Sequence, residues 1–385
     1  MRIVYIIDTL SSKGGAERII SEKMHYMANQ FNYDVSIITC FQFPDSMPNC
    51  YPLSNQVKQI NLCIPSHLQY KCGYPKRLWL KWKYYRLLHQ QVEKTVNSIK
   101  PDIVIGVGYT LADVVCRIKC NAAKIIESHE ARIYTKSSYL HKDYSPLTKL
   151  YYMLSRRLYL RTIENNADVV VTLTKGDTTN WKKVKRVEII PNFSVMPVSK
   201  QSDIDSKRVI AVGRLEWQKG YDRLIDIWKL IYPSHPDWQL DIYGEGTLES
   251  DLRKSIKEAN ISTISIHPFT KDISQEYASS SICVLTSIFE GFSLVILEAM
   301  QHGLPCISFD CPYGPSDLID NEKCGYIIEN GNISLFADRL SFLMDHPDIR
   351  KEFGAAAINK SKSYHVDTIM EQWKSLFESL TEYNY

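Results

Sequence analysis

Short runs of apolar, mostly β-branched residues alternate with longer amphipathic stretches along nearly the whole 385-residue chain. This alternation is typical of parallel sheets covered by helices. In the first half the runs predict strands near residues 3–7, 35–38, 103–106, 124–127, 169–172 and 187–190. In the second half they predict strands near residues 208–212, 239–243, 263–267, 282–285, 305–309 and 326–328. We therefore expect an α/β protein built from two similar halves.

A stretch without hydrophobic periodicity separates the two halves. Turn-forming residues run from Pro191 to Pro197, and polar residues continue to Ser206. We predict two Rossmann-like domains, residues 1–196 and 197–365, with a C-terminal helix over 366–385 that packs back on the first domain. In such proteins the ligand binds beyond the carboxyl ends of the strands.

The composition limits the class of protein. The apolar run at the N-terminus is short and ends at Asp8, which indicates a first strand rather than a signal peptide. No apolar run approaches the roughly 18 to 20 residues that cross a bilayer. Ten cysteines are scattered without a Cys-x-x-Cys pair, which favours reduced thiols. These features predict a cytoplasmic protein.

Charge is divided unevenly along the chain. Residues 1–199 hold 28 Lys plus Arg against 15 Asp plus Glu, whereas the remainder holds 18 against 28. The basic half contains two segments, residues 76–86 and 149–159, in which cations alternate with aromatic and aliphatic residues. Either these helices dock on an anionic membrane surface, at the inner face of a membrane, or they bury an apolar stripe and solvate a basic side. No nucleic-acid-binding module accompanies the positive charge.

The strongest candidate for chemistry is the segment from Val212 to Gly220, directly after the first strand of the second half. Gly213 permits a sharp turn, Arg214 offers a planar fork of donors, and Lys219 offers a flexible point charge. Two such cations on one loop suit a diphosphate. The alternative is a basic loop that is simply solvated.

A second candidate follows the predicted strand at 282–285. Glu290 and Glu298 flank a helix that we expect to start at Ser293, and they lie about 12 Å apart if the helix includes both. The backbone N–H groups of Phe292, Ser293 and Leu294 would then face phosphate oxygens. Alternatively, Glu290 caps the helix and Glu298 makes a structural ion pair.

The order of these motifs resembles a known family. Gly213-Arg214 with Lys219-Gly220, then Tyr243 to Gly246, then Glu290 to Met300, and then Gly303-Leu304-Pro305 are similar to the retaining glycosyltransferases of family 4, which have the GT-B fold. The first half resembles the family more loosely. Its matching positions are Gly14 to Glu17, His129 and Ile190-Pro191-Asn192.

The resemblance implies a role for each matching residue of the second half. Arg214 and Lys219 would bind the donor diphosphate, Glu298 the ribose hydroxyls, and Glu290 the hydroxyls of the transferred sugar. Gly244, Glu245 and Gly246 would let the backbone approach the nucleotide, and His267, Pro268 and Phe269 would frame its base.

For the first half, the resemblance implies that Gly14 and Gly15 leave room for phosphate or acceptor. His129 would reach the donor sugar, although a lone histidine after a strand is more often structural. Asn192 fits a turn residue better than a catalytic one.

One motif departs from the family and one is set aside. The segment Cys311 to Asp317 replaces a Gly-Gly-x-x-Glu pattern of many relatives, so the sugar or acceptor pocket is expected to differ. An Asp-x-Asp sequence at residues 203–205 could suggest a metal, but it lies in the predicted linker and is better explained as solvated charge. We expect no metal and no cofactor, since two cations and a helix N-terminus can stabilise the leaving group.

These features together predict a retaining glycosyltransferase. The donor would be a nucleotide-diphosphate sugar, with UDP-sugars favoured, and the acceptor a glycan or a lipid-linked sugar in cell-surface polysaccharide, lipopolysaccharide or glycolipid synthesis. Two alternatives remain, a nucleotide-sugar epimerase and a non-catalytic sugar-nucleotide-binding subunit. A dehydrogenase is disfavoured because Gly-x-Gly-x-x-Gly is missing after the first strand.

Overall fold

The computed structural model describes residues 1–73, 75–108, 111–129, 131–133 and 145–381. Its Cα positions divide the chain into two compact units. The first comprises Met1–Ile190 with Met370–Tyr385, and the second comprises Pro191–Ile369. The last four residues of the predicted C-terminal helix, 382–385, lie outside the described residues.

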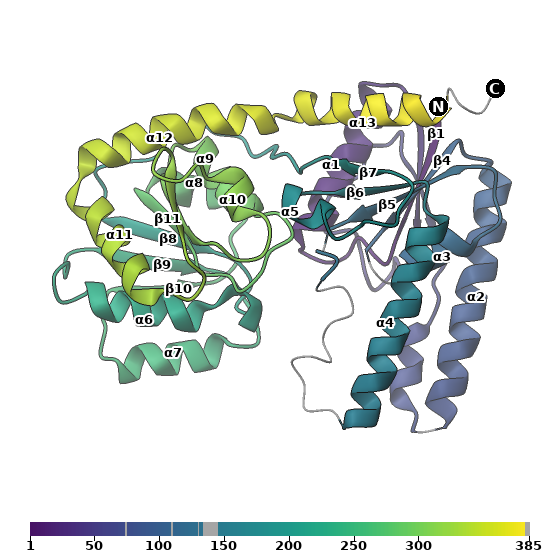
Figure 1. Cartoon of the computed structure of the whole chain (residues 1–385), viewed down its shortest axis with the longest axis horizontal. Helices are drawn as coiled ribbons and strands as arrows, with labels where there is room; N and C mark the ends of the chain where they lie inside the picture. Colours follow the sequence, from purple (N-terminus) through teal and green to yellow (C-terminus); the bar gives the residue numbers. More distant parts are fainter. Residues whose placement is uncertain (74, 109–110, 130, 134–144, 382–385) are drawn as a thin grey trace. The chain divides into compact units, whose positions relative to one another are not determined.

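A seven-stranded sheet forms the centre of the first unit (Figure 1). All of its strands pair in parallel, in the order β3-β2-β1-β4-β5-β6-β7. The strands are β1 (Arg2–Ile7), β2 (Asp34–Thr39), β3 (Lys58–Asn61), β4 (Ile103–Val107), β5 (Ala123–Ser128), β6 (Val169–Thr172) and β7 (Val187–Ile189). The β-branched runs form β1, β2, β4 and β6 because both faces of the sheet are covered and nearly every position of these strands is buried.

Helices cover both faces of this first sheet. They are α1 (Gly15–Asn29), η1 (Ser66–Lys71), α2 (Lys76–Ile99), α3 (Ala112–Arg117), α4 (Pro146–Asn166), α5 (Lys175–Thr178) and α13 (Val366–Thr381). Apolar residues of α2, α3 and α4 share one core with alternate strand positions such as Val4 and Ile126. On the opposite face, α13 lies beside α1, where Lys23 lies over the Trp373 ring.

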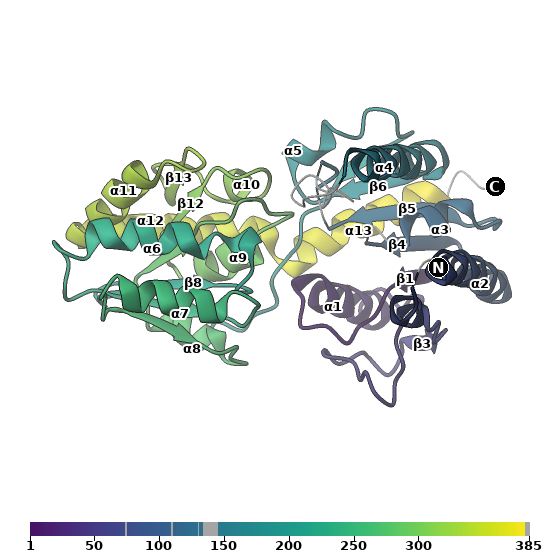
Figure 2. The same ribbon diagram turned by 90° about the horizontal axis from the view of Figure 1, so that it is seen from below.

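The second unit is built in the same way around a six-stranded parallel sheet, in the order β10-β9-β8-β11-β12-β13 (Figure 2). Its strands are β8 (Arg208–Val212), β9 (Gln239–Tyr243), β10 (Ile264–His267), β11 (Ile282–Leu285), β12 (Cys306–Phe309) and β13 (Gly325–Ile328). Its helices are η3 (Trp217–Lys219), α6 (Tyr221–Ile231), α7 (Glu249–Glu258), α8 (Ile273–Ala278), α9 (Leu294–Gln301), α10 (Pro315–Leu318), α11 (Ile333–Asp345), α12 (Pro347–Ser361) and η4 (Lys362–Tyr364).

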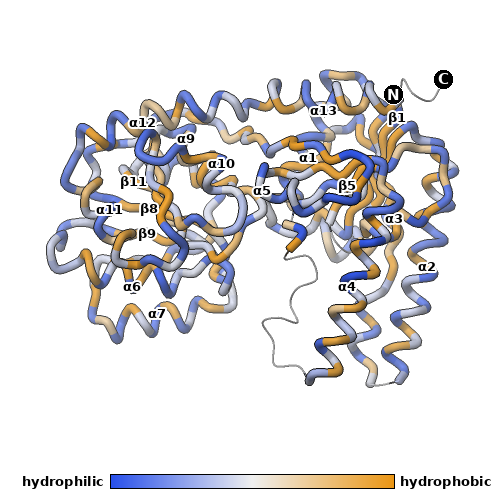
Figure 3. Tube along the Cα trace, viewed as in Figure 1, coloured by the Kyte–Doolittle hydropathy of each residue, from blue (hydrophilic) through white to orange (hydrophobic). Residues whose placement is uncertain are grey.

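The predicted α/β class is confirmed by two parallel sheets, each covered by helices. Hydrophobic residues, orange in Figure 3, are concentrated along the strands of both units. Strand β3 was missed, because it contains one apolar residue, Ile60, in four. Among the described residues, no helix has the length and apolar character needed to span a membrane.

Candidate active site

The loop after β8 is fastened to the loop after β11. The Ile288 N–H donates to the Gln218 carbonyl at 2.8 Å, and the Gln218 side chain donates to the Phe289 carbonyl at 2.9 Å. Strands β8 and β11 are neighbours in the parallel sheet, so their carboxyl ends open at the same edge. The bonds between the loops therefore bring the two strongest candidate motifs of the sequence together.

Lys219 and Glu290 form an ion pair at this edge. The Lys219 ammonium donates to Glu290 Oε1 at 2.7 Å, and the Ser287 hydroxyl donates to the same oxygen at 2.5 Å. Both partners are largely shielded, with 13% and 6% of their side chains exposed. An ammonium carries three N–H donors, so Lys219 can hold Glu290 and still donate to an anion.

Arg214 lies on the same loop and differs from Lys219 in its surroundings. Its side chain is exposed and makes one long hydrogen bond, 3.4 Å, to Gln218. The guanidinium is therefore available to an incoming ligand in a way that a buried, paired arginine is not. The loop thus combines a fixed cation with an adjustable one.

Helix α9 begins at Leu294, and Ser293 is its N-cap residue. The expected helix start near Ser293 agrees with this, and the helix does not include both carboxylates, since Glu290 lies four residues before it while the buried Glu298 lies within it. The Leu294 N–H was predicted to face phosphate oxygens. It instead donates to the Phe292 carbonyl at 3.1 Å. No acceptor is assigned to the N–H groups of Phe292 or Ser293 within the described ranges.

The loop that departs from the family pattern packs against this helix start. The Glu290 N–H donates to the Pro312 carbonyl at 3.1 Å. Gly314 has φ +107°, a conformation that favours glycine, and a Cβ there would lie 3.3 Å from the Ser293 nitrogen. The loop therefore forms one wall beside the candidate anion-binding N–H groups.

Gly244 and Gly246 have a structural role that the sequence did not indicate. A Cβ on Gly244 would overlap the Gly213 carbonyl, and one on Gly246 would overlap the backbone of Leu215. Leu215 also donates its N–H to the Glu245 carbonyl at 2.9 Å. The glycines let the β9–α7 loop cross the β8–η3 loop, so they shape the site whatever they do for a nucleotide.

We expect Gly244→Ala to lower the free energy of unfolding by about 1–3 kcal/mol or more, since neither backbone segment can yield cheaply. The Arg214 loop would also shift, and donor affinity should fall. Urea unfolding and calorimetry measure both effects. Gly73→Ala is the matched control, because a Cβ at Gly73 meets nothing within 4 Å. Unchanged stability and affinity would contradict this role.

Sequence reasoning named Tyr243 and His267 but missed the polar cluster that they form with Asp241 and Arg208. The His267 ring stacks on Tyr243 with centroids 4.5 Å apart, and its Nε2 lies 2.7 Å from Asp241 Oδ1. Arg208 bonds the other Asp241 oxygen at 2.9 Å. Burial and the neighbouring Glu276 carboxylate raise the pKa of Tyr243. The sequence could have indicated this cluster through Asp241 and Tyr243. These two residues carry polar groups and lie two positions apart on one strand, so their side chains share one face of the sheet.

Pro268 and Phe269 directly follow this cluster and are exposed. The Gly244 N–H donates to the His267 carbonyl at 3.0 Å, so their backbone is tied to the glycine loop. An exposed aromatic beside a fixed stack can contact a planar ring. The loops that follow β9 and β10, which carry Gly244, Pro268 and Phe269, are thus joined by a backbone hydrogen bond.

Gly15 and His129 belong to the first unit. Gly14 is the N-cap residue of α1 and Gly15 is its exposed first residue. His129 follows β5, and its Nε2 lies 3.0 Å from Glu127 Oε1. The ring is therefore held from one side by a carboxylate, and His129 is 11% exposed through its side chain.

Glu127 is the centre of a buried charge network. Its Oε1 also accepts a hydrogen bond from the Lys23 ammonium, and both side chains are fully buried. Burial tends to raise the pKa of Glu127, but the charges and hydrogen bonds of Lys23 and His129 outweigh burial and lower this pKa to about 2. Burial lowers the pKa of Lys23, and Glu127 partly offsets that effect. Glu127 is consequently a fixed anion that orients His129.

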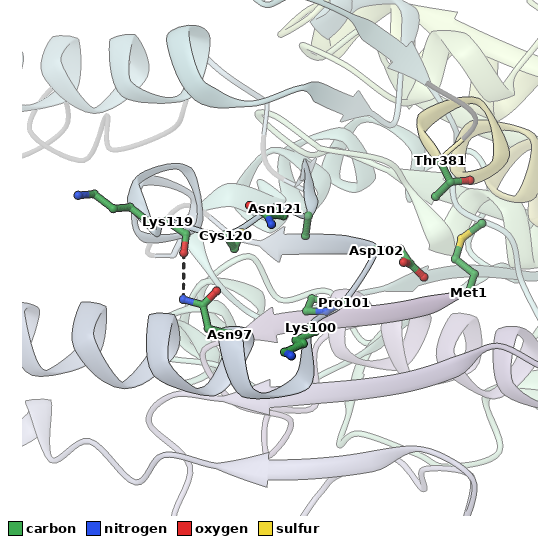
Figure 4. Close-up of a pocket in the computed structure, with 10 residues that line it drawn as sticks. Met1, Asn97, Lys100, Pro101, Asp102, Lys119, Cys120, Asn121 and Thr381 are labelled. Carbon is green, nitrogen blue, oxygen red and sulfur yellow. Dashed lines mark hydrogen bonds between the residues drawn. The ribbon is translucent and has the colours of Figure 1, made fainter. Parts of the chain in front are cut away.

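A separate hollow of about 1240 Å³ lies at the other edge of the first sheet (Figure 4). Its lining includes Met1, Asp102 and Ala122, which directly precede β1, β4 and β5. The close-up shows Asn97 donating to the Lys119 carbonyl, a 3.0 Å hydrogen bond between two of the lining residues. Ligands of parallel α/β sheets bind beyond the carboxyl ends, so we do not assign the active site to this hollow.

Comparison with known proteins identifies the class. Residues 195–360, which include every candidate site residue of the second unit, match the family model described as "Glycosyl transferases group 1". An uncharacterized glycosyltransferase of Haemophilus influenzae is 28% identical over 383 residues, covering 97% of this chain and 99% of the relative. The chain is an enzyme, a glycosyltransferase with the GT-B fold.

Two further proteins are informative. The amylovoran biosynthesis glycosyltransferase AmsD of Erwinia amylovora is 27% identical over 97% of this chain and 99% of its own length. The Anabaena protein Alr3699/HepE, solved in complex with UDP-glucose, superimposes with a TM-score of 0.73 at 16% identity, over 98% of this chain and 100% of that one. At that identity the likeness concerns the fold.

Proposed function

We propose that this glycosyltransferase transfers a hexose or N-acetylhexosamine from a UDP-sugar, with retention of anomeric configuration, to a glycan or lipid-linked sugar. The observation that carries the proposal is the Lys219–Glu290 pair, fastened beside exposed Arg214 and the start of α9. A protein of the same fold, solved with UDP-glucose, supports the proposed donor. A relative named for amylovoran biosynthesis supports the proposed acceptor class. The transferase class also argues against an epimerase or a non-catalytic subunit.

Each proposed role follows from charge and position. When the bond from the sugar to the diphosphate breaks, the electron pair goes to the leaving phosphate oxygen and the sugar becomes oxocarbenium-like. Lys219, Arg214 and the Ser293 N–H would stabilise the growing negative charge in a shielded site. This arrangement supplies positive charge without a metal, so we propose a metal-independent reaction.

The sugar and nucleoside ends would be bound by different carboxylates. Glu290, held by Ser287 and Lys219, would accept hydrogen bonds from sugar hydroxyls, and Glu298 on α9 would accept them from the ribose. Pro268 and Phe269 would contact the base. His129, oriented by Glu127, would contact the donor sugar.

Retention would follow a front-face attack. The acceptor oxygen would bond to the anomeric carbon on the face from which the diphosphate leaves, and the acceptor proton would pass to the leaving phosphate oxygen. Atoms and charge balance without a covalent enzyme intermediate.

A thermal-shift screen of UDP-, GDP- and ADP-sugars tests the donor, because a ligand bound only to the folded state stabilises it by about 2.7 kcal/mol at 100 times its Kd. UDP-sugars should raise the melting temperature most, and a shift confined to GDP-sugars would contradict the donor assignment. NMR of the product formed with a sugar acceptor tests stereochemistry. Inverted configuration would overturn the front-face mechanism.

A further inference from the structure

The first unit carries an unburied apolar and basic surface that the transfer chemistry does not use. We define the α2–α4 surface by its exposed apolar side chains, which include Leu78, Trp79 and Trp82 of α2 and Leu147, Leu150, Tyr151, Leu154 and Leu158 of α4. The N-terminal parts of both helices extend beyond the sheet in the same direction (Figure 1) and are seen nearly end-on in Figure 2. We propose that this surface docks the enzyme on an anionic lipid bilayer.

Within the described residues, the start of α4 packs against no core. None of residues 146–158 is buried, which is about 20 Å of helix at 1.5 Å per residue. Leu147, Leu150, Leu154 and Leu158 nevertheless recur at helical spacing, and Leu147 is 80% exposed. Figure 3 shows apolar segments along this exposed part. An apolar stripe of this kind is typical of an interaction surface.

On α2 the buried and exposed stripes are separate. Leu88, Val92 and Val96 are buried in the core of the unit, whereas Trp79 and Trp82 are each 55% exposed. This excludes, for the start of α2, the alternative that the aromatic residues form a core-facing stripe. Tryptophan is favoured at the membrane–water boundary, where its ring contacts acyl chains and its N–H contacts polar groups.

All charges within these two helix segments are positive. Residues 46–92 and 146–163 contain no Asp or Glu, while five cations lie in 76–86 and four in 146–161. Arg86 lies over the Trp82 ring at 4.8 Å, and Lys83 lies over Trp79 at 5.2 Å. Such long side chains can reach lipid phosphates while the rings enter the headgroup region.

The same charges argue against a second copy as the occupant. A symmetric contact would place these cations against one another, which is unfavourable in a surface removed from water. An anionic bilayer complements both properties at once, the positive charge and the apolar side chains. Since no described helix can span a membrane, the contact would be a shallow one at the interface.

Vesicle flotation with the full chain tests the proposal. The wild type should bind phosphatidylcholine vesicles containing phosphatidylglycerol at least about tenfold more tightly than pure phosphatidylcholine, and high salt should weaken this binding. Lys81→Glu/Lys83→Glu should reduce binding about tenfold or more. The matched control is Lys182→Glu/Lys183→Glu, which makes the same charge change at exposed lysines elsewhere in the unit and should bind like the wild type.

A second variant tests the apolar contribution. Trp79→Ser/Trp82→Ser/Leu150→Ser/Leu154→Ser should lose vesicle binding, whereas Leu230→Ser, at an exposed leucine of the second unit, should not. Unchanged melting temperature and UDP binding would show that the variants fold. Failure of the wild type to bind anionic vesicles, or equal binding by the variants, would overturn the proposal. A change from dimer to monomer in these variants without any vesicle binding would instead assign the surface to self-association.

Discussion

Lys219→Ala should lower kcat by about 10²–10³-fold with every acceptor, because this change removes a positioned donor to the charge that develops on the leaving diphosphate. The expectation rests on geometry. Lys219 is shielded, it is held 2.7 Å from Glu290, and its loop is fastened to the loop after β11. Steady-state kinetics with a soluble acceptor measures the effect. Lys219→Arg should recover little of the rate, since the planar fork cannot replace a compact ammonium in this geometry.

The matched control is Lys229→Ala. Lys229 also pairs with a carboxylate of the second unit, Asp226 at 2.8 Å, but both side chains are about half exposed. Its loss should change neither kcat nor stability measurably. Equal rates for Lys219→Ala and the wild type, with the fold intact by circular dichroism, would remove Lys219 from the mechanism.

Glu127→Gln should destabilise the first unit by about 3–5 kcal/mol, because it leaves the Lys23 ammonium buried without its counter-charge. Urea unfolding measures this free energy. Asp34→Asn is the control, since its pair with Arg2 is exposed and should be worth less than about 1 kcal/mol. The double variant Lys23→Met/Glu127→Leu removes both charges and should recover much of the loss.

The lowered pKa of Glu127 predicts that the free energy of unfolding depends on pH in the acid range. Its pKa is lowered in the fold to about 2, from 4.5, so the stability it contributes is present above pH 4.5 and is lost as the pH falls toward 2. Unfolding measured across this range should have a smaller slope for Glu127→Gln than for the wild type. Identical slopes would mean that Glu127 is not held as a buried anion.

The sequence predicted most of the fold because the central strands are buried on both faces. The run from Ile3 to Ile7 is apolar throughout, and each of its residues is 5% exposed or less. Strand β3 has no such signal. It lies at the edge of the sheet, where its residues are half-buried or exposed. The polar side chains of Lys58, Gln59 and Asn61 can therefore occupy this strand.

The second-unit site was predictable to the level of loops. Arg214, Lys219 and Glu290 follow strands whose carboxyl ends meet at one edge, and strand order in a parallel sheet is strongly constrained. The start of α9 was harder to predict from the sequence, because the position of Glu290 before the helix depends on hydrogen bonds to Ser287 and to the loop at Pro312. Such contacts join segments that local patterns do not relate.

The charge network of the first unit could not be read from the sequence. Lys23 lies on α1, Glu127 on β5 and Trp373 on α13, so their meeting depends on tertiary packing alone. A lysine in an amphipathic helix ordinarily faces water. Only the fold shows that this one is buried, over the Trp373 ring and against Glu127.

The proposed mechanism requires that the loop of Arg214 and Lys219 binds the donor diphosphate. Isothermal titration calorimetry of UDP with the wild type and with Arg214→Ala/Lys219→Ala tests this claim most directly. Charge-assisted hydrogen bonds contribute about 1.5–3 kcal/mol each, so the double variant should bind UDP at least about 100-fold more weakly. Equal affinity for UDP in the two proteins, both folded, would contradict it.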